Sequence, residues 1–383
     1  MRSLVDLLSS ADGRAFLESR GVFDHREAFV DALRPPARAD LAGLLGLATG
    51  SLPVYVGQQV QPDYQSSVVA KFRAARDVGE APGVEPVVLW LDTDRAGSHK
   101  GQTTLSWLGR EEQVRTTRLA ARRWKDLEVR FVPVAEQDLG AAMADLAKWV
   151  GELPRDLRPA AGARRAELAE SLLAARPSTL AEANRAIASF LLDRHLGFSP
   201  VSALASDLTA LVAEPVAELI GQIDDVISVF NGAIEALAAQ DVDPVVKPLG
   251  EEYLPLQYAC PDDGVRRRLM HERRGADHFA VAACTCGRDF RFHLGSGVPS
   301  LGELAGDDRW SPDVTLPVYL NAWASGVVGG RSSALYGLVL NEVVEKVLGE
   351  RAIPMLVPPD LADALPAQRN PDSLLYEFLV SAL

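Results

Sequence analysis

Two short apolar runs, each followed at once by polar residues, constrain the fold of this chain more than any other feature. The run 52–56 leads into Gly57-Gln58-Gln59, and the run 87–91 leads into Asp92-Thr93-Asp94. Both runs have the length and composition of buried strands, and the stretch from Ser67 to Asp77 between them has a helical pattern. Strand, helix and strand predict a parallel βαβ unit with a right-handed crossover.

The polar clusters are candidate site residues because ligands bind at the carboxyl ends of parallel strands. Each cluster by itself is also typical of a loop start or a helix cap. Two of them at one predicted sheet edge favour a site. His99, just beyond Asp94, could orient a phosphate or act as an acid or base, although such residues more often lie on a solvated turn.

The remaining pattern predicts an α/β protein in which two parts of one sheet are separated by insertions. Within the first part, Leu127 to Val134 is predicted as a third strand, and within the helical insertion that follows, Leu211 to Ala239 is the longest helical region. Within the last part, we expect strands at Leu316 to Leu320 and Ile353 to Pro358, and a helix from Ser333 to Leu348. The predicted units are an N-terminal helical segment (1–50), the first half of the core (51–135), a helical insertion (136–245), a Cys/His insert (246–300) and the second half of the core (301–383).

The insert contains all three cysteines of the chain, Cys260, Cys284 and Cys286. Structural zinc sites favour three or four thiolates in a tetrahedron, and a small insert without its own core needs such a link. We therefore expect a structural Zn²⁺, with His278 as the first choice for the fourth ligand and His271 as the second. The alternative is three reduced cysteines packed as small hydrophobic side chains.

A glycine-rich segment, Gly329-Gly330-Arg331-Ser332, follows a predicted strand and opens a predicted helix. Backbone N–H groups at such a helix start can bind a phosphate or carboxylate, and Arg331 adds charge. The segment is not a Walker loop, because no GKS or GKT triplet follows. A structural turn is the alternative reading.

The formal net charge of −13 argues against a nucleic-acid partner, which would need a basic face. The first residues, Met1 to Leu17, have the pattern of an amphipathic helix rather than a secretion signal, and no apolar stretch approaches a membrane span. With three cysteines there is no disulfide framework, so we expect a cytoplasmic protein.

Taken in order, these blocks resemble the bacillithiol-biosynthesis cysteine-adding enzymes, also called putative cysteine ligases. Gly57-Gln58-Gln59 resembles the family's TGQQ block, Lys71 stands at the place of a lysine on the following helix, and Asp92-Thr93-Asp94 resembles its EDHD block. The stretch from Thr179–Ala183 to Asp243-Pro244 resembles the family's helical middle, and the later matches are Arg266–Leu269, Ser311–Val314, Val328–Gly330 and 353–358.

The resemblance implies a Rossmann-like core related to class I aminoacyl-tRNA synthetases, and an enzyme that joins cysteine to the amine of a sugar-linked acceptor. There are departures. The family's EDHD histidine is Thr93 here, the glutamate of its GGPGE block is absent after Gly329-Gly330, its Gly-Pro pair is replaced by Pro62-Asp63-Tyr64, and its Arg-Pro pair by Leu316-Pro317. Its terminal coiled coil has no counterpart, so we expect no dimer through such a segment. A changed substrate is the expectation.

Two hypotheses follow. In the first, the chain is an amide-forming ligase for an amino acid and a small amine in thiol or specialised metabolite biosynthesis, with ATP or another nucleotide as a further ligand. Gln58, Gln59, Asp92 and Asp94 would be its catalytic groups, and Gly57, Lys71, His99, Gly329, Gly330, Arg331 and Ser332 would bind substrate or cofactor. In the second, it is a binding or regulatory protein that kept the fold and a structural zinc but lost catalysis.

Overall fold

A parallel sheet forms the centre of the molecule. The computed structural model describes residues 1–38, 43, 45–97, 102–108, 114–313, 322–358 and 373–381. Within these residues the sheet has six strands in the order β1-β13-β12-β2-β3-β6, and all its pairings are parallel. The strands are β1 (Val22–Phe23), β2 (Leu52–Gln59), β3 (Val84–Leu91), β6 (Val201–Leu204), β12 (Gly326–Val328) and β13 (Met355–Leu356). The two predicted halves therefore do share one sheet.

Both faces of the sheet are buried, which explains why its strands are almost continuously apolar. Along β2, Val54 and Val56 belong to one hydrophobic cluster and Tyr55 to the other. Along β3, Trp90 belongs to the cluster of Val54 and Val56, and Leu89 belongs to the other cluster. The alternation is what the two-residue period of a strand requires when each face is covered by helices.

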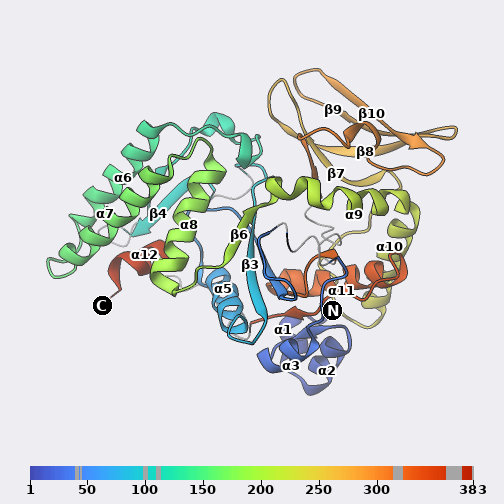
Figure 1. Cartoon of the computed structure of the whole chain (residues 1–383), viewed down its shortest axis with the longest axis horizontal. Helices are drawn as coiled ribbons and strands as arrows, with labels where there is room; N and C mark the ends of the chain where they lie inside the picture. Colours follow the sequence, from blue (N-terminus) through green and yellow to red (C-terminus); the bar gives the residue numbers. More distant parts are fainter. Residues whose placement is uncertain are drawn as a thin grey trace.

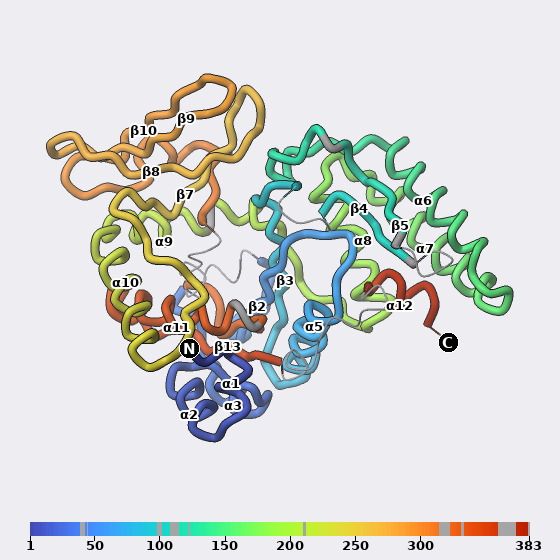
Figure 2. The backbone as a smooth tube through the Cα atoms, turned by 180° about the vertical axis from the view of Figure 1, so that it is seen from behind, coloured from blue at the N-terminus to red at the C-terminus, as the bar shows by residue number. Residues whose placement is uncertain are grey.

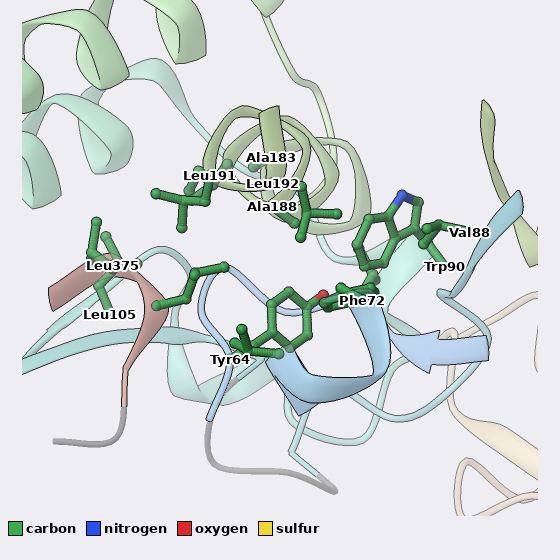
Figure 3. Packing of buried hydrophobic residues seen from close by; sticks show 14 of the residues in the cluster. Tyr64, Phe72, Val88, Trp90, Leu105, Ala183, Ala188, Leu191, Leu192 and Leu375 are labelled. Carbon is green, nitrogen blue, oxygen red and sulfur yellow. The ribbon is translucent and has the colours of Figure 1, made fainter. Parts of the chain in front are cut away.

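One face packs against α5 (Ser66–Val78) and α8 (Leu180–Leu196), and Figure 3 shows this contact. The Tyr64 and Trp90 rings are stacked with centroids 5.9 Å apart, and Phe72 lies 5.8 Å from Trp90. α8 begins with a capping box in which Thr179 and Glu182 satisfy each other's backbone groups. Also on this side are α6 (Glu136–Val150), α7 (Arg158–Ala175) and α12 (Leu374–Val380) (Figure 1).

The other face packs against α9 (Thr209–Gly221), α10 (Ile223–Ala239) and α11 (Arg331–Lys346). The short helices α1 (Leu4–Leu8), α2 (Ala11–Ser19) and α3 (Arg26–Ala32) lie together at the lower end in Figures 1 and 2. None of the described helices has the length and apolar character needed to cross a membrane.

A second sheet, antiparallel, lies at the opposite end from α1–α3 (Figures 1 and 2). Its order is β10-β9-β8-β7-β11. The strands are β7 (Tyr253–Ala259), β8 (Arg266–Arg274), β9 (Asp277–Ala283), β10 (Asp289–Ser296) and β11 (Trp310–Pro312). Its strands β7 to β10 lie within the predicted Cys/His insert (246–300), and β11 lies after it. A separate hairpin pairs β4 (Thr104–Leu108) with β5 (Val114–Arg118).

The prediction of a strand from Leu127 to Val134 is wrong. Val129–Phe131 form a 3₁₀ turn, η3, and only isolated bridges flank it. The reason is local, because the backbone N–H groups of Val129 and Arg130 donate to the carbonyls of Asp94 and Asp92. The segment therefore wraps around the end of β3 instead of adding a strand.

The predicted helical insertion also contains a strand. β6 lies between α8 and α9 and pairs with β3, and its four residues are too short a run to stand out beside long helices. The long helical region is two helices, since α9 ends at Gly221 and α10 begins at Ile223. The predicted strand from Leu316 to Leu320 falls on residues outside the described part of the chain.

Candidate functional site

The predicted polar clusters meet at the carboxyl edge of the parallel sheet. Gln59 pairs with Leu91, so Asp92 follows directly beside the end of β2. Val327 pairs with Tyr55, so Gly329 and Gly57 each lie two residues farther along neighbouring strands. The structure thus brings the three predicted segments to one edge, although Gly57-Gln58-Gln59 are the last residues of β2 rather than a loop after it.

Lys71 is a buried cation at this edge. It lies on α5 with 8% of its surface exposed, and its ammonium donates to Gln58 Oε1 at 2.6 Å and to the Gly57 carbonyl at 3.4 Å. Burial lowers the Lys71 pKa to about 8. An ammonium has three donors. The two contacts to β2 are with neutral oxygens, so a bound anion would improve the electrostatic surroundings of Lys71.

The start of α11 faces the same place. Gly330 is the N-cap, with no side-chain cap, and a Cβ added there would lie 3.9 Å from Lys71 Cδ. The first N–H groups of a helix have no partners within the helix and carry its positive dipole end. A Cβ at position 330 would therefore contact the lysine stem, so Lys71 lies directly beside a helix start that favours anions.

Two other glycines are fixed by close approach. A Cβ on Gly57 would lie 2.5 Å from the Tyr55 hydroxyl oxygen, and one on Gly329 would lie 2.7 Å from Met355 Sδ. Both distances are shorter than side-chain packing allows. Arg331 and Ser332 begin α11, but their side chains are not among those described, and His99 lies outside the described residues.

Asp92 lies at the end of β3 but is engaged inside the protein. It is fully buried, and its carboxylate accepts from the backbone N–H of Ser206 at 3.0 Å and from the Ser206 hydroxyl. Burial raises the Asp92 pKa, and the bonds from Ser206 oppose that shift. Ser206 follows β6, so this pair joins the ends of two neighbouring strands.

Asp94, predicted as a catalytic group, is buried and paired within the protein. It is 9% exposed and forms an ion pair with Arg266, whose Nη1 lies 3.2 Å from Asp94 Oδ1. Because Arg266 is the first residue of β8, this pair connects the parallel sheet to the antiparallel sheet. The pair therefore gives Asp94 a structural contact between the two sheets.

Glu128 completes a buried charge network between the sheets. Its carboxylate lies 3.4 Å from Arg266 Nε and 2.7 Å from Arg130 Nε. Burial raises the Glu128 pKa to about 7, against the effect of both arginines. Two acids and two bases therefore share the junction, with Arg266 between Asp94 and Glu128.

The three cysteines come together as expected. Cys260, Cys284 and Cys286 form a group with Asp263 in which one ligand atom from each lies within 4.8 Å of the others. The sulfurs of Cys260 and Cys286 are 3.7 Å apart, and Cys284 Sγ lies 3.3 Å from Asp263 Oδ2. Three thiols and a carboxylate are a donor set that could hold a metal ion.

The expected histidine ligand is wrong in this structure. His278 Nδ1 lies 2.9 Å from His271 Nε2 and the two rings are stacked, so each histidine has the other as its partner. Neither belongs to the cysteine group. The sequence analysis missed Asp263, although Cys260 and Asp263 have the spacing of a CxxC ligand pair with a carboxylate in the second position.

No protein-family model matches the chain, and no curated protein shows significant similarity to it. The resemblance to the cysteine-adding enzymes therefore stays a prediction.

Proposed function

We propose that this protein is an amide-forming ligase that joins an amino acid to a small amine, with its reaction centre at the carboxyl edge of the parallel sheet. The observation that carries the proposal is Lys71, a buried ammonium beside Gln58 and the uncapped start of α11. The order of the sequence blocks supports cysteine as the amino acid and a sugar-linked amine as the acceptor.

Lys71 would bind the anionic group of a substrate or nucleotide. With a pKa of about 8, roughly nine-tenths of this lysine is protonated at pH 7. Its remaining donor and the first N–H groups of α11 can bind a carboxylate or phosphate. Gln58 Oε1 and the Gly57 carbonyl both accept from Lys71, which keeps the ammonium in place.

Amide formation needs an activated carboxyl group. ATP would supply it by transferring a phosphoryl or adenylyl group to the carboxylate, with release of ADP or pyrophosphate. The acceptor amine would then attack the carbonyl carbon, displace the phosphate or AMP, and lose its proton to solvent or to the leaving group. A cation beside the leaving group stabilises the charge that develops on it, which is the step we assign to Lys71.

The second hypothesis, a binding protein without catalysis, has one observation in its favour. Asp92 and Asp94 are both engaged within the protein. Neither is therefore available, in this arrangement, as the base that would deprotonate the acceptor amine.

Calorimetric titration with Mg²⁺–ATP and with cysteine tests the proposal. We expect binding to the wild-type protein that weakens at least about tenfold in Lys71→Met, because a charge-assisted contact contributes roughly 1.5–3 kcal/mol. Lys148→Met is the matched control, since its side chain is 77% exposed. Binding that is equal in Lys71→Met and wild type would refute the assignment of this edge as the site.

We also propose that Cys260, Asp263, Cys284 and Cys286 hold one structural Zn²⁺ in a cytoplasmic protein. A zinc tetrahedron with Zn–S distances of 2.3 Å separates two sulfurs by about 3.8 Å, and a sulfur from an oxygen by about 3.6 Å. The 3.7 Å and 3.3 Å separations of this group are close to those values. The four side chains are thus arranged for a small tetrahedral ion.

A further inference from the structure

The cysteine group lies where the antiparallel sheet meets the parallel core. Cys260 and Asp263 stand on the loop between β7 and β8, and Cys284 and Cys286 on the loop between β9 and β10. A metal held by all four would therefore tie two hairpin loops together. The effect of this link on the rest of the protein depends on the residues that the two loops contact.

The first loop packs directly on the core. Val265 forms an antiparallel bridge with Leu127, and a Cβ on Gly264 would lie 3.1 Å from Leu127 Cγ. The loop is held in shape by bonds from Cys260 N to the Val265 carbonyl and from Val265 N to Asp263 Oδ1. A metal ligand and the core contact thus belong to one tight turn.

The residue after this turn is Arg266, which reaches Asp94 and Glu128. A second link comes from the other side, since Arg309 Nη1 contacts the Cys260 carbonyl at 3.4 Å and Arg130 donates to the Arg309 carbonyl at 3.2 Å. The core segment 127–130 is therefore linked to the metal loop in two ways, through Arg266 and through Arg309.

We propose that the metal centre, with Asp263 as its fourth ligand, is a clamp between the two sheets. The ion fixes the Cys260–Val265 turn against Leu127 and so holds Arg266 between Asp94 and Glu128. Since Asp94 and Asp92 end the strand beside the Lys71 site, the clamp also sets the geometry of that edge. The inference rests on the proposed zinc site but not on ligase activity.

Hydrogen exchange measured by mass spectrometry, with and without zinc, tests the clamp. Two backbone amides report on the core side of the junction. Ala96 N–H donates a hydrogen bond to the Leu127 carbonyl, and Val129 N–H donates one to the Asp94 carbonyl. Removing zinc with a chelator should speed exchange at these amides at least about tenfold, because they lose a fixed neighbour. Amides in the middle of α2, at the opposite end of the molecule from the antiparallel sheet (Figures 1 and 2), are the internal control.

Three variants identify the fourth ligand through zinc content and exchange. Asp263→Ala should lose zinc and show the fast exchange of the chelated protein. Asp263→Cys should keep zinc and slow exchange, because a thiolate is an equally good ligand. His278→Ala should keep zinc, since this histidine is bonded to His271 instead.

The outcomes separate the claims. If zinc loss changes exchange only in the loops 260–265 and 283–288, the clamp is wrong while the zinc site stands. If the purified protein neither contains nor takes up zinc, both are wrong. If Asp263→Cys loses zinc, or His278→Ala does, the assignment of Asp263 fails. A folded Asp263→Cys protein keeps the test decisive even if Asp263→Ala does not fold.

Discussion

Replacing Lys71 by methionine should weaken ligand binding and yet change the pH dependence of folding in a predictable direction. The Lys71 pKa is about 8 in the folded protein, against an ordinary value of 10.5, because the ammonium is buried. The unfolded chain therefore binds more protons than the folded one between pH 8 and 10.5. In that window the free energy of unfolding rises with pH.

The size of the effect follows from the two pKa values. With 8 and 10.5, the lowered Lys71 pKa destabilises the folded protein by about 3.4 kcal/mol at pH 7 and by about 0.8 kcal/mol at pH 10. Wild-type stability should thus increase by about 2.5 kcal/mol relative to Lys71→Met between these pH values. At pH 7 the variant should be at least as stable as the wild type. Its gain in stability is reduced because the Gln58 oxygen loses its donor.

Urea denaturation at pH 7, 8, 9 and 10 measures the free energy of unfolding of both proteins. Subtracting the value for Lys71→Met from that of the wild type cancels the titration of all groups that the two proteins share. Lys148→Met, at an exposed position, should follow the wild type at every pH. A wild-type minus Lys71→Met difference that stays flat from pH 7 to 10 would refute the claim that Lys71 is a desolvated ammonium in the folded protein.

Two further predictions concern the buried charges. Arg266→Met should lower the free energy of unfolding by about 3 kcal/mol, because Glu128 loses a partner in a fully buried position, whereas Arg291→Met, on an exposed ion pair, should cost less than about 1 kcal/mol. Ser206→Ala should cost about 1.5–3 kcal/mol by removing a hydroxyl donor from buried Asp92. Chemical denaturation at pH 7 measures both, and equal effects of Arg266→Met and Arg291→Met would contradict the first.

The sequence predicts the parts of the fold in which a local pattern and the tertiary structure agree. β2, α5 and β3 follow from apolar runs around a helical stretch. The short strands β1, β6 and β12 were missed, because two to four residues carry no period. Their place in the sheet is decided by partners far along the chain, and no local signal encodes that.

In the candidate site, too, some contacts follow from sequence patterns and others depend on residues far apart in the chain. The meeting of Gly57 with Gly329 follows from the rule that parallel strands end at one edge. The pairing of Asp94 with Arg266 does not, because it joins residues 172 positions apart on different sheets. Asp263 was missed because carboxylates are common and a histidine is the more usual partner of three cysteines in zinc sites.

Mass spectrometry of a reaction mixture tests the proposed function most directly. The protein, loaded with zinc, would be incubated with Mg²⁺–ATP, a mixture of amino acids and an amino-sugar glycoside as the acceptor. Ligase activity predicts a product whose mass is that of one amino acid plus the acceptor minus one water, formed together with ADP or AMP. It should be lost in Lys71→Met and kept in Lys148→Met. A folded, zinc-loaded protein that consumes no nucleotide and forms no such product with any amino acid would contradict the proposal and favour a binding protein on this fold.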